Sequence, residues 1–187
     1  MDFIETEFPG LWVIRPKVFR DERGFFLESF RMKSFAEHGL DRPFVQANHA
    51  RSEAKGVLRG MHFQIPPMAQ AKLVRVIRGA VLDVVVDLRR NSPTFGRSYS
   101  IALRADEFTQ LYIPRGFAHG YLTLEEETEF QYMVDEYYSP DHEQGIAWND
   151  PKLNVDWSEN DPILCERDRN FPRLNDFSTP FLFDLRT

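Results

Sequence analysis

Cysteine is almost absent from this chain, since Cys165 is the single thiol among 187 residues. No disulfide can therefore form within the chain, and the composition fits a reducing compartment. Cys165 could be a nucleophile, although an incidental or structural cysteine is the commoner case. Long apolar runs are also absent, because no stretch approaches the roughly 18 residues of a membrane helix. The first ten residues, MDFIETEFPG, carry acids where a signal peptide carries bases, so we expect a cytoplasmic protein.

An excess of basic charge is likewise missing. The 23 lysines and arginines are outnumbered by 29 aspartates and glutamates, which gives a net charge of −6. This balance argues against a nucleic-acid-binding surface, and we expect no membrane partner. It leaves room for an anionic small molecule, because a few arginines in a cleft can reverse the electric field locally.

A histidine pair of the form H-x-H, which would suit a metal ion in a small β-barrel, does not occur among the five histidines. Gln64 stands where a second ligand to accompany His62 would fall. Two facing histidines without an obvious carboxylate companion make a poor iron or zinc site. We therefore expect no metal ion, and a metal-dependent enzyme is kept as an alternative.

The chain is rich in aromatic and β-branched residues that occur in short runs. Its 17 phenylalanines and 42% hydrophobic content favour a packed β interior. Turn-forming residues separate the runs, which is typical of a sandwich or barrel, and the length fits one domain over residues 1–187. Helical signals are sparse: residues 31–39 predict a short helix, and the tail from about 148 to 187 is expected to be irregular with one more short helix. The predicted strands are 11–19, 24–30, 57–64, 72–79, 80–89, 98–104, 110–114, 118–124 and 129–138.

Strand alternation places several polar side chains among apolar neighbours. Lys72 shares a strand face with Val74 and Val76, where burying an amine is costly unless it has a partner or a task. Each such residue, taken alone, is most often a core residue whose polar atom is satisfied. Four of them in one small domain indicate a cleft. The four are His62, Lys72, His119 and Tyr132.

Arg59 fits this cleft only if the strand around it is irregular. Strict alternation puts Arg59 on the face opposite His62. Gly60 lies between them, and a glycine inside a strand often marks a bulge, which would bring both side chains to one side.

The chain also carries a series of specific motifs. In order they are RDERGFFLESF (20–30), VLRGMHFQ (57–64), AQAKLVRVIRGAVLDVVVDLR (69–89), SPTFG (92–96), QLYIPRGFAHG (110–120), EFQYMV (129–134) and GIAWNDP (145–151). Together they resemble the dTDP-4-dehydrorhamnose 3,5-epimerase family, from about residue 3 to about residue 172. The resemblance implies an all-β, cupin-like jelly-roll barrel (a double-stranded β-helix) with a few short helices and a barrel core over about 45–140. It also implies a homodimer that exchanges N-terminal strands, and no metal or organic cofactor.

This resemblance implies catalytic roles for four residues. His62 is similar to the family's general base, and Tyr132 to the acid on the opposite side of the sugar. Asp168, within CERD, resembles the aspartate that orients the base. Lys72 resembles the lysine beside the keto oxygen of the sugar.

The resemblance also implies a set of contacts to a nucleotide-sugar substrate. Arg23 and Glu28 are expected to bind its nucleotide end, with Arg23 reaching across the dimer. The other expected contacts are Gln46, Asn48, Arg59, Lys72, His119, Glu143 and Arg167.

Three positions depart from the usual pattern of the family. Met133 stands where a lysine often follows the tyrosine, Ala50 replaces a serine, and Arg167 stands where a lysine commonly precedes the aspartate. No proposed catalytic group is lost, but the departures leave the choice of substrate open.

The activity that the resemblance implies is epimerisation at C3 and C5 of dTDP-4-keto-6-deoxy-D-glucose to dTDP-4-keto-L-rhamnose, through enolate intermediates and without a cofactor. Three alternatives stay open. The first is an epimerase that acts at C3 or C5 only, on a related nucleotide sugar. The others are a metal-dependent cupin and a non-catalytic sugar-binding cupin; the non-catalytic one predicts loss of at least one catalytic residue, and all four are present.

Overall fold

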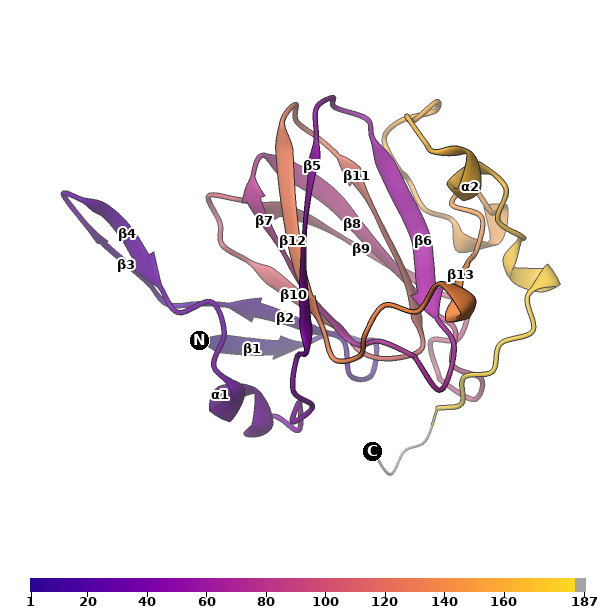
Figure 1. The fold of residues 1–187 in the computed structure, drawn as a ribbon, viewed down its shortest axis with the longest axis horizontal. Coiled ribbons are helices and arrows are strands. Elements are labelled where there is room, and N and C mark those ends of the chain that lie inside the picture. The colour runs from indigo at the N-terminus through magenta and orange to yellow at the C-terminus, as the bar shows by residue number, and fades with distance from the viewer. Residues whose placement is uncertain (184–187) are drawn as a thin grey trace.

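The computed structural model describes residues 1–183, and most of its regular structure is antiparallel β-sheet (Figure 1). The predicted all-β fold is confirmed, because two large sheets face each other as a jelly-roll barrel and a small hairpin stands apart. The six-stranded sheet has the order β1 (Asp2–Glu5), β2 (Trp12–Arg15), β10 (Gln110–Ile113), β7 (Lys72–Arg78), β12 (Thr128–Val134) and β5 (Gln46–Ser52). The five-stranded sheet has the order β13 (Glu143–Gly145), β6 (Leu58–Gln64), β11 (Phe117–Thr123), β8 (Ala80–Asp87) and β9 (Ser98–Arg104). The hairpin pairs β3 (Val18–Asp21) with β4 (Gly24–Leu27).

From β5 onward the chain passes back and forth between the two large sheets, except at the β8–β9 hairpin. Segments that are distant in sequence therefore become neighbours. His62 of β6 lies opposite His119 of β11, and Tyr132 of β12 lies opposite Val74 of β7. This connectivity gathers the polar residues of separate motifs around one interior.

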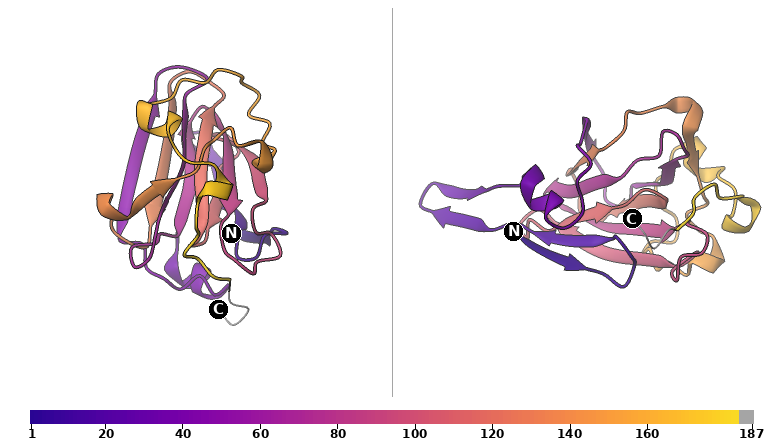
Figure 2. Two further views of the ribbon diagram at one scale, coloured as in Figure 1. Left: turned by 90° about the vertical axis from the view of Figure 1, so that its right-hand side faces the viewer. Right: turned by 90° about the horizontal axis from the view of Figure 1, so that it is seen from below.

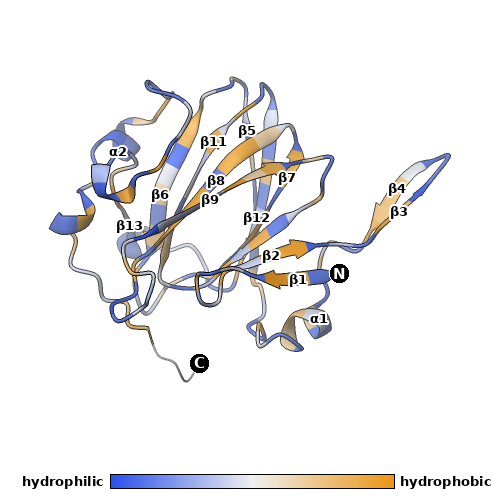
Figure 3. Cartoon of the chain, turned by 180° about the vertical axis from the view of Figure 1, so that it is seen from behind, coloured by the Kyte–Doolittle hydropathy of each residue, from blue (hydrophilic) through white to orange (hydrophobic). Residues whose placement is uncertain are grey.

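The interior between the two sheets is largely apolar. Val74, Val85 and Phe130 are buried there, and β-branched and aromatic residues of this kind suit a pleated surface. A second apolar cluster, which includes Phe63 and Trp157, packs the outer side of the five-stranded sheet against the C-terminal chain. Strand β8 is buried at every position except Leu82, which is half-buried, and it is hydrophobic over most of its length (Figure 3), as expected for a strand covered on both faces.

The predicted elements differ from the structure mainly at their ends. Residues 11–19, predicted as one strand, form β2 and β3, because Pro16 has no N–H with which to continue a ladder. The helix expected over 31–39 is the shorter α1 (Met32–Ala36). Gly39 follows it in the left-handed region, where the Leu40 N–H bonds the Phe35 carbonyl and ends the helix.

Three strands were not predicted, namely β1, β5 and β13. The tail contains one short α-helix, α2 (Glu166–Arg169), as expected, and two 3-10 turns, η2 (Pro151–Leu153) and η3 (Leu174–Asp176). A further 3-10 turn, η1 (Pro140–His142), precedes β13. None of the helices within residues 1–183 has the length and apolarity needed to span a bilayer.

The β3–β4 hairpin projects away from the barrel (Figures 1 and 2). It carries Phe25 and Phe26, whose exposed fractions are 58% and 70%. Large aromatic side chains at this exposure are costly to leave in water, so the hairpin is a candidate interaction surface.

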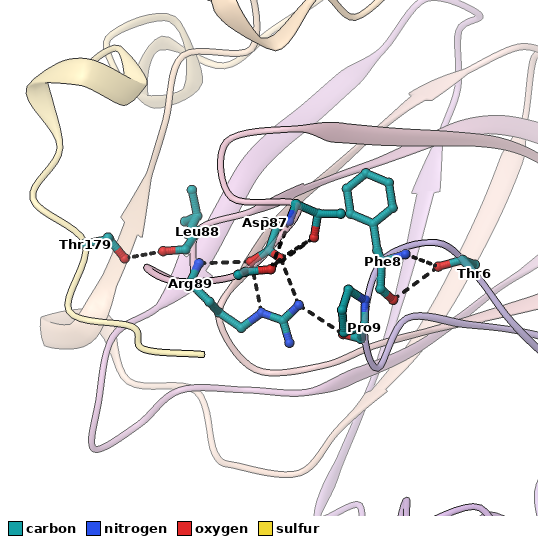
Figure 4. A network of polar contacts seen from close by, with 9 residues as sticks. Thr6, Phe8, Pro9, Asp87, Leu88, Arg89 and Thr179 are labelled. Carbon is teal, nitrogen blue, oxygen red and sulfur yellow. Dashed lines mark hydrogen bonds and ion pairs between the residues drawn. The ribbon is translucent and has the colours of Figure 1, made fainter. Parts of the chain in front are cut away.

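A buried polar network holds the loop after β8 in place (Figure 4). Asp87 accepts hydrogen bonds from the Arg89 guanidinium and from the hydroxyls of Ser92 and Thr94, at 2.5–2.9 Å. Arg89 in turn donates to the carbonyl of Pro9 at 2.9 Å. The network thus links β8, the loop that follows it and the N-terminal turn. Both oxygens of the Asp87 carboxylate accept hydrogen bonds within it.

Candidate active site

A cavity of about 450 Å³ lies between β6 and β11 of one sheet and β7 and β12 of the other. The chain around Cys165, which leads into α2, forms one wall. Eight of the predicted site residues line this cavity. They are Arg59, His62, Lys72, His119, Tyr132, Glu143, Arg167 and Asp168.

His62 and Asp168 form a hydrogen-bonded pair at the edge of the cavity. The His62 Nε2 lies 2.8 Å from Asp168 Oδ1, and the backbone N–H of Gly60 donates to Asp168 Oδ2 at 3.0 Å. Burial opposes ionisation of Asp168, but the hydrogen bonds from His62 and Gly60 outweigh it and lower the pKa of Asp168 to about 2. An ionised carboxylate requires a proton on Nε2, which leaves Nδ1 of His62 free to accept one.

Arg59 shares the cavity with His62 because β6 is bulged between them. His62 pairs with His119 and Arg59 pairs with Tyr121, so three steps along β6 match two along β11. Gly60 has a φ of +144°, a conformation that L side chains rarely adopt. The bulge that the glycine suggested is therefore present, and it turns the Arg59 guanidinium to the same side as the imidazole.

Lys72 brings an amine into the cavity from the first position of β7. Its side chain is buried, and burial lowers the pKa of Lys72 to about 8, against the opposing charges of Asp83 and Glu143. Near neutral pH it is therefore mostly an ammonium in a low-dielectric site. A charge placed there is poorly screened by water.

Tyr132 faces the cavity from β12, on the sheet opposite to that of His62. Burial and the negative charge of Glu143 raise the pKa of Tyr132 above its ordinary value of 10. The phenol is therefore protonated at neutral pH and is a hydrogen-bond or proton donor. The cavity thus has a proton acceptor, Nδ1 of His62, on one wall and a proton donor, the Tyr132 phenol, on the other.

Glu143, Tyr138 and Arg167 are joined at the rim of the cavity. Glu143 Oε2 accepts from the Tyr138 hydroxyl at 2.8 Å and from Arg167 Nη1 at 2.6 Å. Arg167 Nη2 also lies 3.3 Å from Nε2 of His62. Tyr138 was not predicted, although the sequence shows an aromatic pair, Tyr137 and Tyr138, shortly after the end of β12 at Val134.

Gln46 and Asn48 lie in a smaller adjoining space of about 200 Å³. The Gln46 amide donates to Asn48 Oδ1 at 2.9 Å, and its oxygen accepts from the backbone N–H of Tyr138. Lys72 and Tyr132 border both spaces. The two spaces together can receive a ligand longer than a single sugar ring.

Two predicted contacts are not brought to this site within one chain. Arg23 lies at the turn of the β3–β4 hairpin, where it pairs with Asp21, and Glu28 pairs with Arg31. Neither lines the cavity around His62.

Asp83 of β8 was missed altogether. It accepts a hydrogen bond from Nε2 of His119 at 2.9 Å, inside the barrel. The signal for it was present in the sequence, since it is the one charged residue within AVLDVVV (80–86). Among the described residues, no group of three or more histidines, cysteines and carboxylates is arranged to hold a metal ion.

The sequence pattern of the dTDP-4-dehydrorhamnose 3,5-epimerase family matches residues 5–176. A dTDP-4-dehydrorhamnose 3,5-epimerase of Shigella flexneri is 48% identical over 177 residues, which cover 94% of this chain and 97% of that protein. The crystal structure of a Bacillus anthracis dTDP-4-dehydrorhamnose 3,5-epimerase, with TDP and PPi bound, is 46% identical, with a TM-score of 0.90 over 92% of this chain and 98% of that one. A dTDP-6-deoxy-D-glucose-3,5-epimerase of Legionella pneumophila, in complex with dTDP-4-keto-L-rhamnose, is 43% identical, with a TM-score of 0.88 and 93% of each chain covered.

Proposed function

The chain belongs to the dTDP-4-dehydrorhamnose 3,5-epimerase family, and from that premise we propose how its cavity carries out the reaction. The enzyme converts dTDP-4-keto-6-deoxy-D-glucose to dTDP-4-keto-L-rhamnose by inverting C3 and C5. The observation that carries the proposal is the opposition of the His62–Asp168 pair and Tyr132 across one cavity, with Lys72 buried beside both.

The hydrogens at C3 and C5 are acidic because both carbons are adjacent to the C4 carbonyl. His62 takes the proton from one face of the sugar onto Nδ1, and the C–H electron pair passes into an enolate. Asp168 holds the ring through Nε2–H and stabilises the imidazolium that forms. Positioned proton transfer of this kind contributes roughly 10²- to 10⁴-fold to the rate.

Lys72 stabilises the enolate. Its ammonium is held in a buried site, so it can meet the negative charge that develops on the keto oxygen without first being reorganised. This role accounts for an amine that would otherwise be costly to bury among valines.

Tyr132 returns a proton to the carbon from the opposite face, which inverts its configuration. Its phenol is protonated at neutral pH and faces the sugar from the other sheet. The phenolate then regains a proton from solvent, and His62 loses its proton to solvent, so no net charge or atom is left on the enzyme.

Arg59 and Arg167 provide positive charge for the diphosphate of the substrate. Guanidinium groups match phosphate oxygens with paired hydrogen bonds, and Arg59 and Arg167 both line the cavity. Binding energy from the nucleotide end can position the sugar ring for proton transfer.

We further propose a homodimer in which each β3–β4 hairpin delivers Arg23 and Glu28 to the cavity of the other copy. Two observations support it: Phe25 and Phe26 are exposed, and the hairpin lies far from β6, the strand that carries His62 (Figure 1). A cytoplasmic location is also proposed, in keeping with a single exposed thiol, Cys165.

The direct test is to incubate the protein with dTDP-4-keto-6-deoxy-D-glucose in D₂O and follow C3 and C5 by NMR. We expect deuterium at both carbons and formation of dTDP-4-keto-L-rhamnose. Label at one carbon alone would instead make the protein a mono-epimerase, and label at neither would contradict the proposed reaction.

A further inference from the structure

Asp83 carries a carboxylate into the apolar interior of the barrel. Its exposed fraction is 0%, and β8 places it on the same strand face as Val85, beside His119 of the neighbouring β11. A buried carboxylate is costly in free energy unless it is fully paired or has a task. The burial of the Asp83 carboxylate must therefore be explained by its partners or by a function.

A second aspartate on the same strand shows what a purely structural role looks like here. Asp87 is equally buried, and both of its oxygens are used by Arg89, Ser92 and Thr94 (Figure 4). Among the described residues, Asp83 has one hydrogen-bond partner, the Nε2 of His119. Within residues 1–183, its Oδ1 is a buried oxygen without a hydrogen-bond partner, so packing and hydrogen bonding alone do not explain it.

The contact with Asp83 decides which nitrogen of His119 carries a proton. Burial lowers the pKa of His119, although the charge of Asp83 opposes this, so the ring is neutral near pH 7. Its single N–H must point to the carboxylate through Nε2, at 2.9 Å. The remaining nitrogen, Nδ1, is then an acceptor, on a ring that lines the cavity and stacks on Phe130.

Asp83 also acts on Lys72, which faces it from the opposite sheet. The negative charges of Asp83 and Glu143 both favour the ammonium, against the burial that lowers the pKa of Lys72 to about 8. Without Asp83, only Glu143 of these two carboxylates would be left to stabilise the ammonium of Lys72. The amine would then be neutral over more of the working pH range.

We infer that Asp83 is a positioning residue of this reaction: it fixes His119 as a hydrogen-bond acceptor for a hydroxyl of the sugar and helps to keep Lys72 cationic for the enolate. This inference rests on the proposed function. Under this inference His119 accepts a hydrogen bond from a hydroxyl of the sugar, whereas Lys72 donates one to the keto oxygen. A sugar without that hydroxyl would leave a buried acceptor unpaired and would be a poorer substrate.

The first experiment determines the tautomer of His119 by ¹⁵N NMR of the ligand-free protein at pH 7, with the signal assigned by loss in His119→Gln. We expect a neutral ring with its proton on Nε2. A proton on Nδ1, or a charged ring, would overturn the inference. This measurement needs neither turnover nor a variant at Asp83, so it gives an answer even if the protein proves not to epimerise the sugar.

The second experiment compares Asp83→Asn with Asp87→Asn, a matched change on the same strand. For Asp83→Asn we expect kcat to fall about tenfold or more and the alkaline limb of its pH profile to move down by about one unit, with dTDP affinity retained. For Asp87→Asn we expect a lower melting temperature and an unmoved pH profile. If Asp83→Asn keeps the kcat and pH profile of an active wild-type enzyme, or if both variants move the profile equally, the inference is wrong.

Discussion

At the scale of single residues, the buried amine of Lys72 is the group whose ionisation should govern the alkaline side of catalysis. Its pKa is lowered to about 8, mainly by burial, with Asp83 and Glu143 opposing. Below that pH the ammonium can stabilise an enolate, and above it the neutral amine cannot. Burial raises the pKa of Tyr132 above 10. The phenol therefore ionises at a higher pH than the Lys72 amine, and the two ionisations can be distinguished in a pH profile.

We therefore predict that kcat declines as the pH rises through about 8. Lys72→Met should lower kcat by about 10²- to 10³-fold at pH 7, because one donor to a developing oxyanion is removed. Lys72→Arg keeps its charge throughout, so any activity that it retains should no longer decline near pH 8. Steady-state kinetics from pH 6 to pH 10 check this, and an alkaline limb that persists in Lys72→Arg would assign the titration to another group.

Some site residues could be predicted from the residues themselves and others could not. His62, Lys72, His119 and Tyr132 break the apolar alternation of strands, so each was visible as a polar group facing a β interior. Asp168 lies in the short helix α2 of the tail, where no strand periodicity indicates the direction of a side chain, and only the family resemblance predicted that it orients the base. Asp83 had the same visible signal as Lys72, but its run, 80–89, was predicted only as a strand and no site role was given to the aspartate.

At the scale of the element, the bulge at Gly60 sets the geometry of the catalytic wall. A Cβ at this position would lie 2.5 Å from the Cα of Gly120 on the neighbouring strand. The N–H of Gly60 also donates to Asp168, which holds His62. One residue therefore governs both the packing of β6 on β11 and the support of the base.

We predict that Gly60→Ala destabilises the protein more than Gly24→Ala does. Both glycines have φ values outside the range of L residues, +144° and +126°, and strain of that kind costs about 1–3 kcal/mol. Only Gly60 is also crowded, which adds about 1–3 kcal/mol, since nothing lies within 4 Å of a Cβ built at Gly24. Urea denaturation measures the free energy of unfolding of both variants. An equal decrease in the two would contradict the prediction, because it would mean that β6 and β11 can move apart to accept the methyl group without cost.

The strands of the interior were predictable because their β-branched and aromatic runs follow the pleat. Strand β5 was not predictable from its own residues, because its sequence QANHARS is largely polar and carries small residues. Its place beside β12 is set by pairing with a distant strand rather than by its own composition. The division of residues 11–19 at Pro16 was recognisable in principle, since proline interrupts a ladder.

At the scale of the whole molecule, the proposed homodimer completes a cavity that one chain leaves without Arg23 and Glu28. The projecting hairpin forms a separate two-stranded sheet (Figure 2), and Arg20 and Phe25 lie against the ring of Phe108. The exposed Phe25 and Phe26 would be covered by a second copy. Under this arrangement each active site draws on two chains.

We predict that Arg23→Ala and His62→Asn, each weakly active alone, regain activity when the two are unfolded and refolded together. A hybrid dimer has one site with both groups intact, so random mixing should restore roughly a quarter of wild-type activity. Phe25→Ser with Phe26→Ser should yield monomers in analytical ultracentrifugation, while Phe95→Ser, at an exposed phenylalanine outside the hairpin, should not. Wild-type monomers, or mixtures no more active than their parts, would rule out the exchange.

The central claim is that His62 removes a proton from one face of the sugar and Tyr132 returns one to the other. Deuterium incorporation by Tyr132→Phe and His62→Asn in D₂O tests it most directly, with C3 and C5 of dTDP-4-keto-6-deoxy-D-glucose followed by NMR. In Tyr132→Phe the base still works, so we expect deuterium to enter with the original configuration retained, while inversion slows by about 10²- to 10⁴-fold. In His62→Asn we expect neither label nor inversion. Wild-type inversion by Tyr132→Phe, or wild-type label uptake by His62→Asn, would contradict the account.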